Sequence, residues 1–269
     1  MSYSPLVLSV AVLPRERLRQ RVASRREVST IHQLHVVLKA VLFDFNGVII
    51  KDESIHRELN DELLIAENLP PQGKEFWKVC VGRSDRAALT DLLKSRGRFV
   101  SDEYLDKLIA KKAIAYRERL TKLETLPIYP DVIDFIKQMH ESGYKLAVVT
   151  GAIRSEAEFV LAQAEIDGYF ETIIASDDIS QSKPDPEGYL LAIKKLNQLD
   201  PELNLVPAEC MAIEDTFAGL TALKRAGIQA VAISNTYPFH MLQRRANWTI
   251  DRFEDLEFDR INDFFGSLA

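Results

Sequence analysis

Asp44 follows directly after a predicted buried strand, a place where a carboxylate can take part in chemistry. In the segment VLFDFNGVII, residues 41–50, an apolar run that predicts a buried strand stops at Asp44, and an amide, Asn46, follows two positions later. A carboxylate directly after a buried strand can attack an electrophile, bind a metal ion or cap the turn that follows. The polar residues at other predicted strand ends decide between these roles.

Polar residues that suit phosphate chemistry follow three further predicted strands. The segment KLAVV is followed by Thr150 and Gly151, TIIAS is followed after a loop by Lys183, and CMAI is followed by Glu214 and Asp215. In a parallel sheet, ligands bind beside the carboxyl ends of the strands, near the point where the strand order reverses. We therefore expect these residues to converge on one site with the acid of the first strand.

Together these groups match the requirements of phosphoryl transfer through an aspartyl-phosphate. We expect Asp44 to attack phosphorus as a carboxylate nucleophile. Lys183 and the hydroxyl of Thr150 are expected to bind the phosphate oxygens, together with backbone N–H groups near Gly151. The predicted catalytic residues are therefore Asp44, Lys183 and the neighbouring Asn46.

The same strand ends predict a divalent cation as cofactor. Because Mg²⁺ prefers carboxylate oxygens, we expect Asp44 and Asp215 to bind it, with Glu214 in support. Taken singly, each residue suits a cap, a turn or a solvated surface, and only their order at successive strand ends favours the site. A calcium loop at DFNGVIIKDESI is excluded, because glycine stands at the fourth position instead of the sixth and Ile55 replaces the final glutamate.

Hydrophobic periodicity divides the chain into two parts. Residues 54–124 show helical periodicity only, whereas predicted strands alternate with predicted helices from residue 125 onward. Such alternation is typical of an α/β fold with a doubly wound, Rossmann-like parallel sheet. We expect residues 37–53 and 125–269 to form this core and residues 54–124 to be inserted into it as a helical domain.

The N-terminal segment differs in composition from the rest. Residues 1–35 contain six arginines and two glutamates, without a sustained periodicity that would bury them. We expect residues 1–36 to form a poorly ordered extension. Since the whole chain carries a net charge of −6, the remainder is strongly acidic, which argues against a nucleic-acid partner and favours a small phosphorylated metabolite.

Cysteine usage and hydropathy indicate the cellular compartment. Cys80 and Cys210 lie far apart and have no neighbouring cysteine or histidine, so neither a disulfide framework nor a zinc site is expected. This favours a cytoplasmic protein. No apolar run approaches the roughly 20 residues that span a bilayer, so no membrane association is expected. A monomer and a small homo-oligomer both stay open.

In combination, the motifs resemble those of the haloacid dehalogenase superfamily, and within it the β-phosphoglucomutase-like branch of phosphatases and mutases. FDFNGVI with DESIH is similar to the first motif, VVTG to the second, SKPDPEGY to the third and AIEDTFAGLTALKRAG to the fourth, over about residues 38–250. The resemblance implies that the helical block is a mobile cap, hinged around Asp52 and Pro127, that closes over a small phosphorylated substrate. It also implies that the backbone carbonyl of Asn46 is a Mg²⁺ ligand.

Asn46 departs from the pattern of this family. Its phosphatases and mutases carry a second aspartate at this position, which protonates the leaving group and later activates water. An amide can accept and donate hydrogen bonds but has no proton to exchange near neutral pH. General acid-base assistance is worth about 10²- to 10⁴-fold in rate, so esters with poor leaving groups should react slowly. His56 is an alternative proton donor, although packing at the hinge explains it as well.

The predicted cap loop VGRSDRAAL carries two arginines that could select the substrate. Arg83 and Arg86 can bind a distal phosphate or carboxylate through two N–H groups each, or they can be solvated helix-start residues. The related mutases carry an arginine at the position aligned with Asp85, so the match is displaced. We therefore expect a Mg²⁺-dependent hydrolase of small phosphate monoesters. A phosphosugar mutase and a non-catalytic binder of a phosphorylated ligand are the alternatives.

Overall fold

A six-stranded parallel sheet forms the centre of the computed structural model, which describes residues 37–267. The strands lie in the order β3-β2-β1-β4-β5-β6, so the order reverses at β1. The expected N-terminal extension, residues 1–36, lies outside the described residues. The strands are β1 (Ala40–Phe43), β2 (Lys145–Val149), β3 (Thr172–Ile174), β4 (Cys210–Glu214), β5 (Gln229–Ile233) and β6 (Trp248–Ile250).

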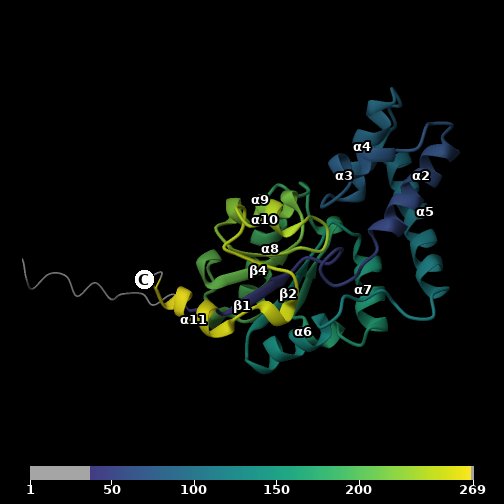
Figure 1. Ribbon diagram of the computed structural model, residues 1–269. Helices are drawn as coiled ribbons and strands as arrows, with labels where there is room; N and C mark the ends of the chain where they lie inside the picture. Colours follow the sequence, from purple (N-terminus) through teal and green to yellow (C-terminus); the bar gives the residue numbers. More distant parts are fainter. Residues whose placement is uncertain (1–36, 268–269) are drawn as a thin grey trace, which may run out of the picture.

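Helices cover both faces of the sheet (Figure 1). In β1, Val41 and Phe43 face one group of helices and Ala40 and Leu42 face the other, and all four side chains are buried. Because both faces are covered, the strands are apolar throughout instead of alternating with polar residues. The first face carries α6 (Val132–Glu141), α7 (Arg154–Gln163) and α11 (Phe258–Ser267), and the second carries α8 (Glu187–Leu199), α9 (Phe217–Ala226) and α10 (Phe239–Leu242).

The predicted α/β, doubly wound fold is confirmed. β1 lies between β2 and β4, so the carboxyl ends of three strands that are distant in sequence meet at the reversal point. The end of the predicted helix at 216–226 follows from its terminal residue, since Gly227 has a φ of 76°, a backbone conformation that favours glycine. β6 is not part of the predicted pattern.

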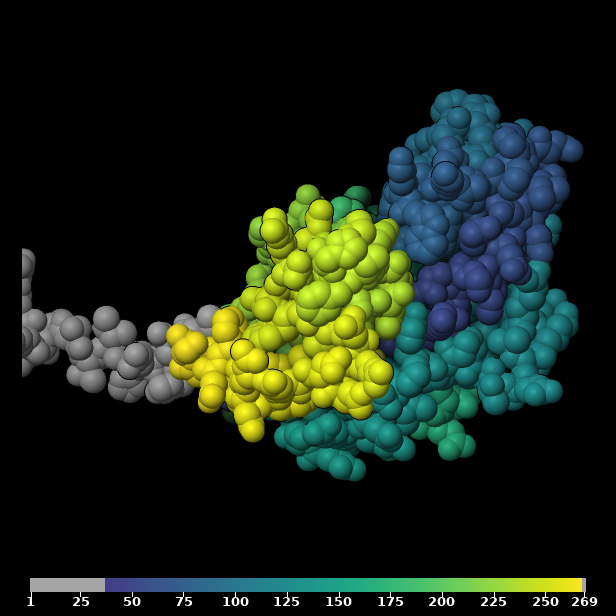
Figure 2. Space-filling view, viewed as in Figure 1, coloured from purple at the N-terminus to yellow at the C-terminus, as the bar shows by residue number. Residues whose placement is uncertain are grey.

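Four helices are inserted between β1 and β2 and form a lobe beside the sheet (Figures 1 and 2). Many of their apolar side chains, including Leu63, Phe76 and Leu92, pack in a cluster separate from the two that flank the sheet. Leu59 of α2 and Tyr116 and Leu120 of α5 instead pack with one of the sheet clusters. The division into a core and a helical cap at residues 54–124 stays a prediction that this packing supports. The helices are α2 (Glu53–Ala66), α3 (Phe76–Val79), α4 (Asp85–Ser95) and α5 (Asp102–Thr121).

If the cap has its own core, a cavity there should loosen the cap alone. Leu92→Ala removes a side chain that is fully buried in the cap cluster, which costs about 2–5 kcal/mol in typical cores. Hydrogen exchange should then accelerate at the amides of residues 53–121, while the strand amides stay protected. Val231→Ala in β5 is the control, since it should weaken protection in the strands. Equal loss of protection in both regions by Leu92→Ala would contradict two cores.

Candidate active site

Asp44 lies directly beyond β1, at the carboxyl edge of the sheet. Its backbone N–H donates to the carbonyl of Ile213 in β4 at 3.0 Å, so the sheet pairing itself positions the residue. Two donors contact its Oδ1: the backbone N–H of Phe45 at 2.8 Å and the ammonium of Lys183 at 2.7 Å. Because Oδ1 is held in this way, Oδ2 is the oxygen that can approach an electrophile.

Lys183 joins the loop after β3 to the strand ends. Its ammonium donates to Asp44 Oδ1, to Glu214 Oε1 at 2.8 Å and to the carbonyl of Val149 at 3.0 Å. These contacts use its three N–H groups, and the ring of Tyr189 lies 5.2 Å from Nζ. Burial acts to lower the pKa of Lys183, but the carboxylates of Asp44 and Glu214 outweigh it and raise this pKa. A positive charge is therefore held permanently at the site.

Glu214 ends β4 and is hydrogen-bonded on both oxygens. Oε1 accepts from Lys183 and from the hydroxyl of Tyr189 at 2.8 Å, and Oε2 accepts from the Thr216 hydroxyl at 3.0 Å. The Thr216 hydroxyl in turn accepts from the N–H of Gly219 and caps α9. Burial acts to raise the pKa of Glu214, but the ammonium of Lys183 and these hydrogen bonds lower it. Glu214 is therefore an ionised anchor for the lysine.

Asp215 is buried without a hydrogen-bond partner for either carboxylate oxygen among the described residues. A Cβ at Gly47 would lie 1.9 Å from Asp215 Oδ2, so only glycine leaves room for this carboxylate. Oxygens of Asp44, Glu214 and Asp215 lie within 4.8 Å of one another. Three clustered carboxylates, one of them without any donor, fit a divalent cation such as Mg²⁺.

Mutual repulsion in this cluster appears in the pKa values. Burial, and then the charge of Glu214, raises the pKa of Asp44 to about 7 in spite of the neighbouring Lys183. Burial and the charges of Glu214 and Asp44 raise the pKa of Asp215 well above its ordinary value. A bound cation would offset the repulsion and favour the ionised carboxylates.

The loop after β2 supplies the predicted hydroxyl. Thr150 Oγ1 accepts from the backbone N–H of Ala152 at 3.0 Å and lies 3.5 Å from Asn46 Oδ1. Gly151 lines the same pocket as Asp44 and Asn46. A Cβ at Gly151 would lie 3.0 Å from the backbone of Arg83, so the cap loop approaches this loop closely. The structure thus brings the predicted phosphate-binding residues beside the predicted nucleophile.

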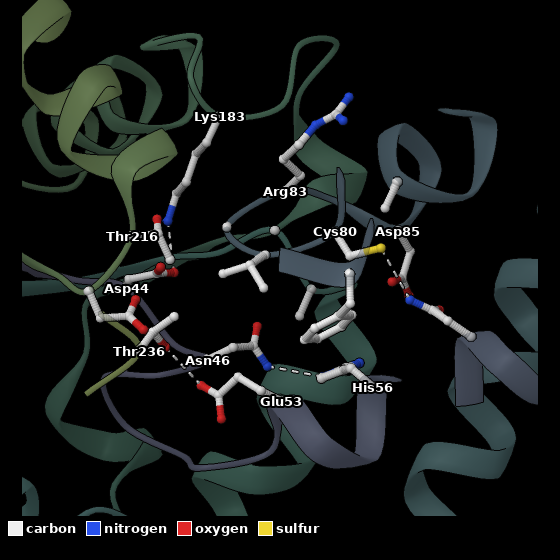
Figure 3. A pocket seen from close by; sticks show the side chains of 18 of the residues that line it. Asp44, Asn46, Glu53, His56, Cys80, Arg83, Asp85, Lys183, Thr216 and Thr236 are labelled. Atoms are coloured by element: carbon white, nitrogen blue, oxygen red, sulfur yellow. Dashed lines mark hydrogen bonds and ion pairs between the residues drawn. The ribbon is translucent and has the colours of Figure 1, made fainter. Parts of the chain in front are cut away.

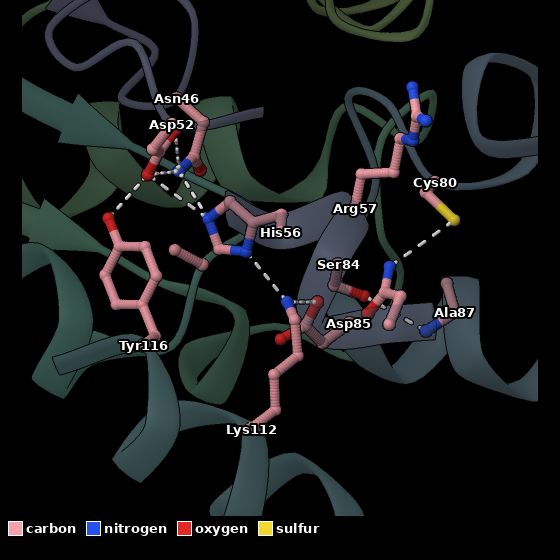
Figure 4. Close-up of polar contacts among 12 residues, drawn as sticks. Asn46, Asp52, His56, Arg57, Cys80, Ser84, Asp85, Ala87, Lys112 and Tyr116 are labelled. Atoms are coloured by element: carbon pink, nitrogen blue, oxygen red, sulfur yellow. Dashed lines mark hydrogen bonds and ion pairs between the residues drawn. The ribbon is translucent and has the colours of Figure 1, made fainter. Parts of the chain in front are cut away.

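The amide of Asn46 is hydrogen-bonded to Asp52, the predicted hinge residue (Figure 4). Its Nδ2 lies 2.9 and 3.1 Å from the two oxygens of Asp52, the residue before α2. Asp52 also accepts from the hydroxyl of Tyr116 at 2.5 Å and lies 3.2 Å from His56 Nε2. Asn46 therefore links the nucleophile loop to the carboxylate at the start of the cap.

A second buried charge network continues from the hinge into the cap (Figure 4). Lys112 of α5 is 1% exposed and donates to Asp85 at 2.5 Å and to His56 Nδ1 at 2.8 Å. Burial acts to lower the pKa of Lys112, but Asp85 and the other nearby carboxylates raise it, so the ammonium stays charged. His56 Nδ1 is then the acceptor, and Nε2 carries the proton towards Asp52. The ring of His56 also stacks on Tyr116, so the residue both packs and bonds at the hinge.

A pocket that is partly open to solvent lies between the strand ends and the cap (Figure 3). Asp44, Asp215 and Lys183 line its core side. The cap side carries both apolar and polar groups: Phe76, Cys80, Val81, Ala88, Asn60 and Asp85. Glu156 of α7 also lines it, is 1% exposed, and has no hydrogen-bond partner for either carboxylate oxygen among the described residues.

The two cap arginines occupy different places. Arg83 lines the cavity, but its guanidinium pairs with Asp91 at 2.8 Å and turns away from Asp44 (Figure 3). Arg86, the other candidate for substrate binding, does not line this cavity. Two aspartates of α5, Asp102 and Asp106, pair with its guanidinium, which lies beside a separate surface pocket.

Contacts between cap and core hold the cap against the strand ends. The N–H of Ser84 donates to the hydroxyl of Ser182 at 2.8 Å, in the loop that carries Lys183. A Cβ at Gly82 would lie 2.6 Å from Thr216 Oγ1, so the loop residue must be small. The helical lobe therefore contacts the strand ends in the described conformation.

Two charged residues of these networks were not predicted, although the sequence contains a signal for each. Lys112 follows Leu108 and precedes Tyr116 at spacings of four, so it falls within the apolar stripe of its helix. Glu156 precedes Val160 by four residues on the buried face of α7. A charged residue inside an apolar stripe indicates a buried partner or a ligand.

Comparison with known proteins gives consistent results. Residues 38–227 match the family model described as haloacid dehalogenase-like hydrolase. The chain is 29% identical to Protein CbbY of Rhodobacter capsulatus over 79% of this chain and 92% of that protein. It is 28% identical to a phosphorylated carbohydrates phosphatase of Thermotoga maritima, over 72% of this chain and 84% of that protein. The crystal structure of β-phosphoglucomutase from Clostridium difficile superposes with a TM-score of 0.74 at 22% sequence identity. The match covers 86% of this chain and 98% of that one.

Gly219 should be indispensable, because it makes room for Glu214. An added Cβ would lie 1.7 Å from Glu214 Oε1, so Gly219→Ala must push the carboxylate away from Lys183 and Tyr189. We expect a loss of about 3 kcal/mol or more in the free energy of unfolding, measured by urea denaturation. Gly266→Ala is the control, since no atom lies within 4 Å of its added Cβ. Equal stability of the two variants would show that Glu214 is not held as described.

Glu156 should make stability depend on pH. Burial raises its pKa from 4.5 to about 7, so the folded protein holds this proton more tightly than the unfolded chain. The resulting stability is fully present below pH 4.5 and is lost as the pH rises through about 7. Relative to wild type, Glu156→Gln should therefore gain stability between pH 5 and 8, by up to about 3 kcal/mol. Glu158→Gln, on the same helix but exposed, should show no such trend. A pH-independent difference for Glu156→Gln would refute the buried acid.

Proposed function

Because the chain belongs to the haloacid dehalogenase-like hydrolase family, we propose that it hydrolyses small phosphate monoesters with Asp44 as the nucleophile. Its matched relatives include phosphatases, and a phosphoglucomutase shares its fold. The relative from Thermotoga maritima is named for phosphorylated carbohydrates, which supports a small phosphorylated metabolite as substrate class.

The geometry of Asp44 is the observation that carries this proposal. Two donors hold Oδ1, so Oδ2 is oriented for attack on phosphorus and a phosphoenzyme can form. The ammonium of Lys183 stands beside the carboxylate and stabilises the charge that develops on the phosphoryl oxygens. Thr150 and the backbone N–H groups near Gly151 bind these oxygens from the neighbouring loop.

Mg²⁺ is the proposed cofactor. Asp44, Asp215 and the backbone carbonyl of Asn46 would hold it, with Glu214 in support. When bound, the ion neutralises phosphate charge and orients the phosphoryl group. The carboxylate oxygens of Asp215, which are buried without a donor among the described residues, support this assignment.

Asn46 limits the chemistry that these residues can perform. Its Nδ2 contacts both oxygens of Asp52 and lies 3.1 Å from His56 Nε2, which fixes its orientation, but the amide cannot transfer a proton to a leaving oxygen. Release of an alkoxide is therefore unassisted, whereas an aryl oxide leaves with little need for protonation. The same feature favours a second candidate function, the binding of a phosphorylated ligand with little or no turnover.

A phosphosugar mutase is the less favoured alternative. A mutase must bind a second phosphate at the cap, which calls for a cation there. Within residues 37–267, Arg83 is paired with Asp91, and Arg86 lies outside the cavity. Asp85 places a negative charge on the cavity wall.

Activity should depend strongly on the leaving group. With Mg²⁺ present, 4-nitrophenyl phosphate should be hydrolysed measurably, and alkyl or sugar phosphates more slowly by about 10²- to 10⁴-fold. Phosphate release should be abolished by Asp44→Ala and by removal of divalent cations with a chelator. Activity that survives Asp44→Ala would exclude the aspartyl-phosphate. Stable binding of phosphate esters without hydrolysis of any would favour the second candidate.

Asn46→Asp should restore general acid-base assistance. The introduced carboxyl group would lie beside Asp52, whose charge favours its protonated form, as a general acid requires. Turnover of sugar phosphates should rise by about one to four orders of magnitude, and that of 4-nitrophenyl phosphate by less. The kcat values of both substrates are compared for the wild type and the variant.

Deamidation must be excluded in that experiment, since Asn46 precedes the flexible Gly47. Intact mass of freshly prepared protein reports any aspartate formed at this position. If undeamidated wild type hydrolyses sugar phosphates at ordinary enzyme rates and Asn46→Asp changes nothing, another group supplies the proton.

A further inference from the structure

The residues that line the cavity include hydrogen-bond acceptors that lack donors among the described residues. Glu156 is 1% exposed, and neither of its oxygens has a partner within the described residues. Asn60 of α2 is 2% exposed and lines the same cavity, and its Oδ1 has no partner there either. Buried acceptors without donors are costly, so their retention indicates a ligand that donates to them.

The orientation of Asn60 follows from its neighbours. Cys80 Sγ donates to Gln72 Oε1 at 3.2 Å, and burial raises the pKa of Cys80 to about 12, so the thiol keeps its proton. The sulfur can then only accept from Asn60 Nδ2, at 3.7 Å. The carbonyl oxygen of this amide is therefore the atom that is left without a donor.

Carboxylates are prominent among the charged groups near Glu156. Asp85 and Glu156 line the cavity and the charge of Asp52 acts on Glu156, whereas the guanidinium of Arg83, which also lines the cavity, pairs with Asp91. Burial raises the pKa of Glu156, and the charges of Lys112 and His56 act to lower it. However, Lys112 hydrogen-bonds Asp85 and His56 and makes no hydrogen bond to Glu156.

We propose that the leaving group of the natural substrate carries an ammonium, and that Glu156 is its counter-ion, with Asn60 Oδ1 as a further acceptor. This inference rests on the proposed function, since it names the substrate class of the same site. An ammonium supplies donors to acceptors that have none, and its charge offsets the excess of carboxylates. A second phosphate or a carboxylate on the leaving group would meet Glu156 and Asp85 and is disfavoured. The substrates are therefore phosphate monoesters of amino alcohols or amino sugars.

Three esters of nearly equal size test the charge preference. They are 2-aminoethyl phosphate, 2-hydroxyethyl phosphate and phosphoglycolate, which carry an ammonium, a hydroxyl and a carboxylate at the same position. Binding is measured by titration calorimetry with Mg²⁺ in an Asp44→Asn background, which removes the nucleophile while keeping its size. The amine ester should bind about 10- to 100-fold more tightly than the hydroxyl ester, and phosphoglycolate should bind most weakly.

Two further variants in that background assign the preference to Glu156. Glu156→Gln should reduce the advantage of the amine ester to within about threefold, mainly by weakening that ester. Glu158→Gln is the matched control, because it removes the same charge from the exposed side of α7 and should leave the preference intact. Thermal unfolding of Glu156→Gln should be unchanged or shifted upward, which excludes a folding defect as the cause.

The outcomes separate the inference from the proposed function. Hydrolysis of 4-nitrophenyl phosphate by the wild type tests the chemistry at Asp44 and involves no ammonium. If that reaction occurs but the three esters bind equally, or phosphoglycolate binds best, the ammonium site is wrong. The same conclusion follows if none of the esters binds, or if Glu156→Gln keeps the amine preference. If the aryl ester is not hydrolysed while the amine ester is preferred through Glu156, the binding site stands and the hydrolase assignment falls.

Discussion

Three carboxylates, those of Asp44, Glu214 and Asp215, lie buried at one edge of the sheet, and their mutual repulsion constrains everything around them. The fold opposes this repulsion with a single buried ammonium, Lys183, which is tied to two of the three. Glycines next to the acids leave room for them, because any larger side chain would overlap the carboxylates. Asp215 is left without a donor among the described residues, and a cation would offset the charge of these acids.

A second buried cluster of charged and polar residues connects the cap to the core. Asn46 and Asp52 couple the nucleophile loop to the first cap helix, and Lys112 continues the chain of contacts into α5. Because each contact needs the next for its hydrogen bonds, displacement of the cap would leave buried polar groups unpaired. Asn46, which stands in place of the expected second aspartate, therefore also helps to position the cap on the core.

Much of the core could be predicted from sequence, since strand ends with polar residues in a parallel sheet must share one edge. Asp44, Lys183 and Asp215 followed from this rule alone. The cap side could not be predicted in the same way, because contacts between helices depend on their rotation and crossing, which periodicity does not specify. Arg86 illustrates the limit: its loop reaches the cavity, but the aspartates of a neighbouring helix pair with its guanidinium elsewhere.

The closing contacts of the cap involve Gly82, Gly151 and the backbone of Ser84, with little contribution from large side chains. Asn60 also lines the cavity but lies on α2, away from these contacts. The cap–core contacts and this cavity residue therefore lie at different positions. Over evolutionary time, such an arrangement lets a duplicated gene acquire a new substrate by changing a few helix residues while the lid continues to shut.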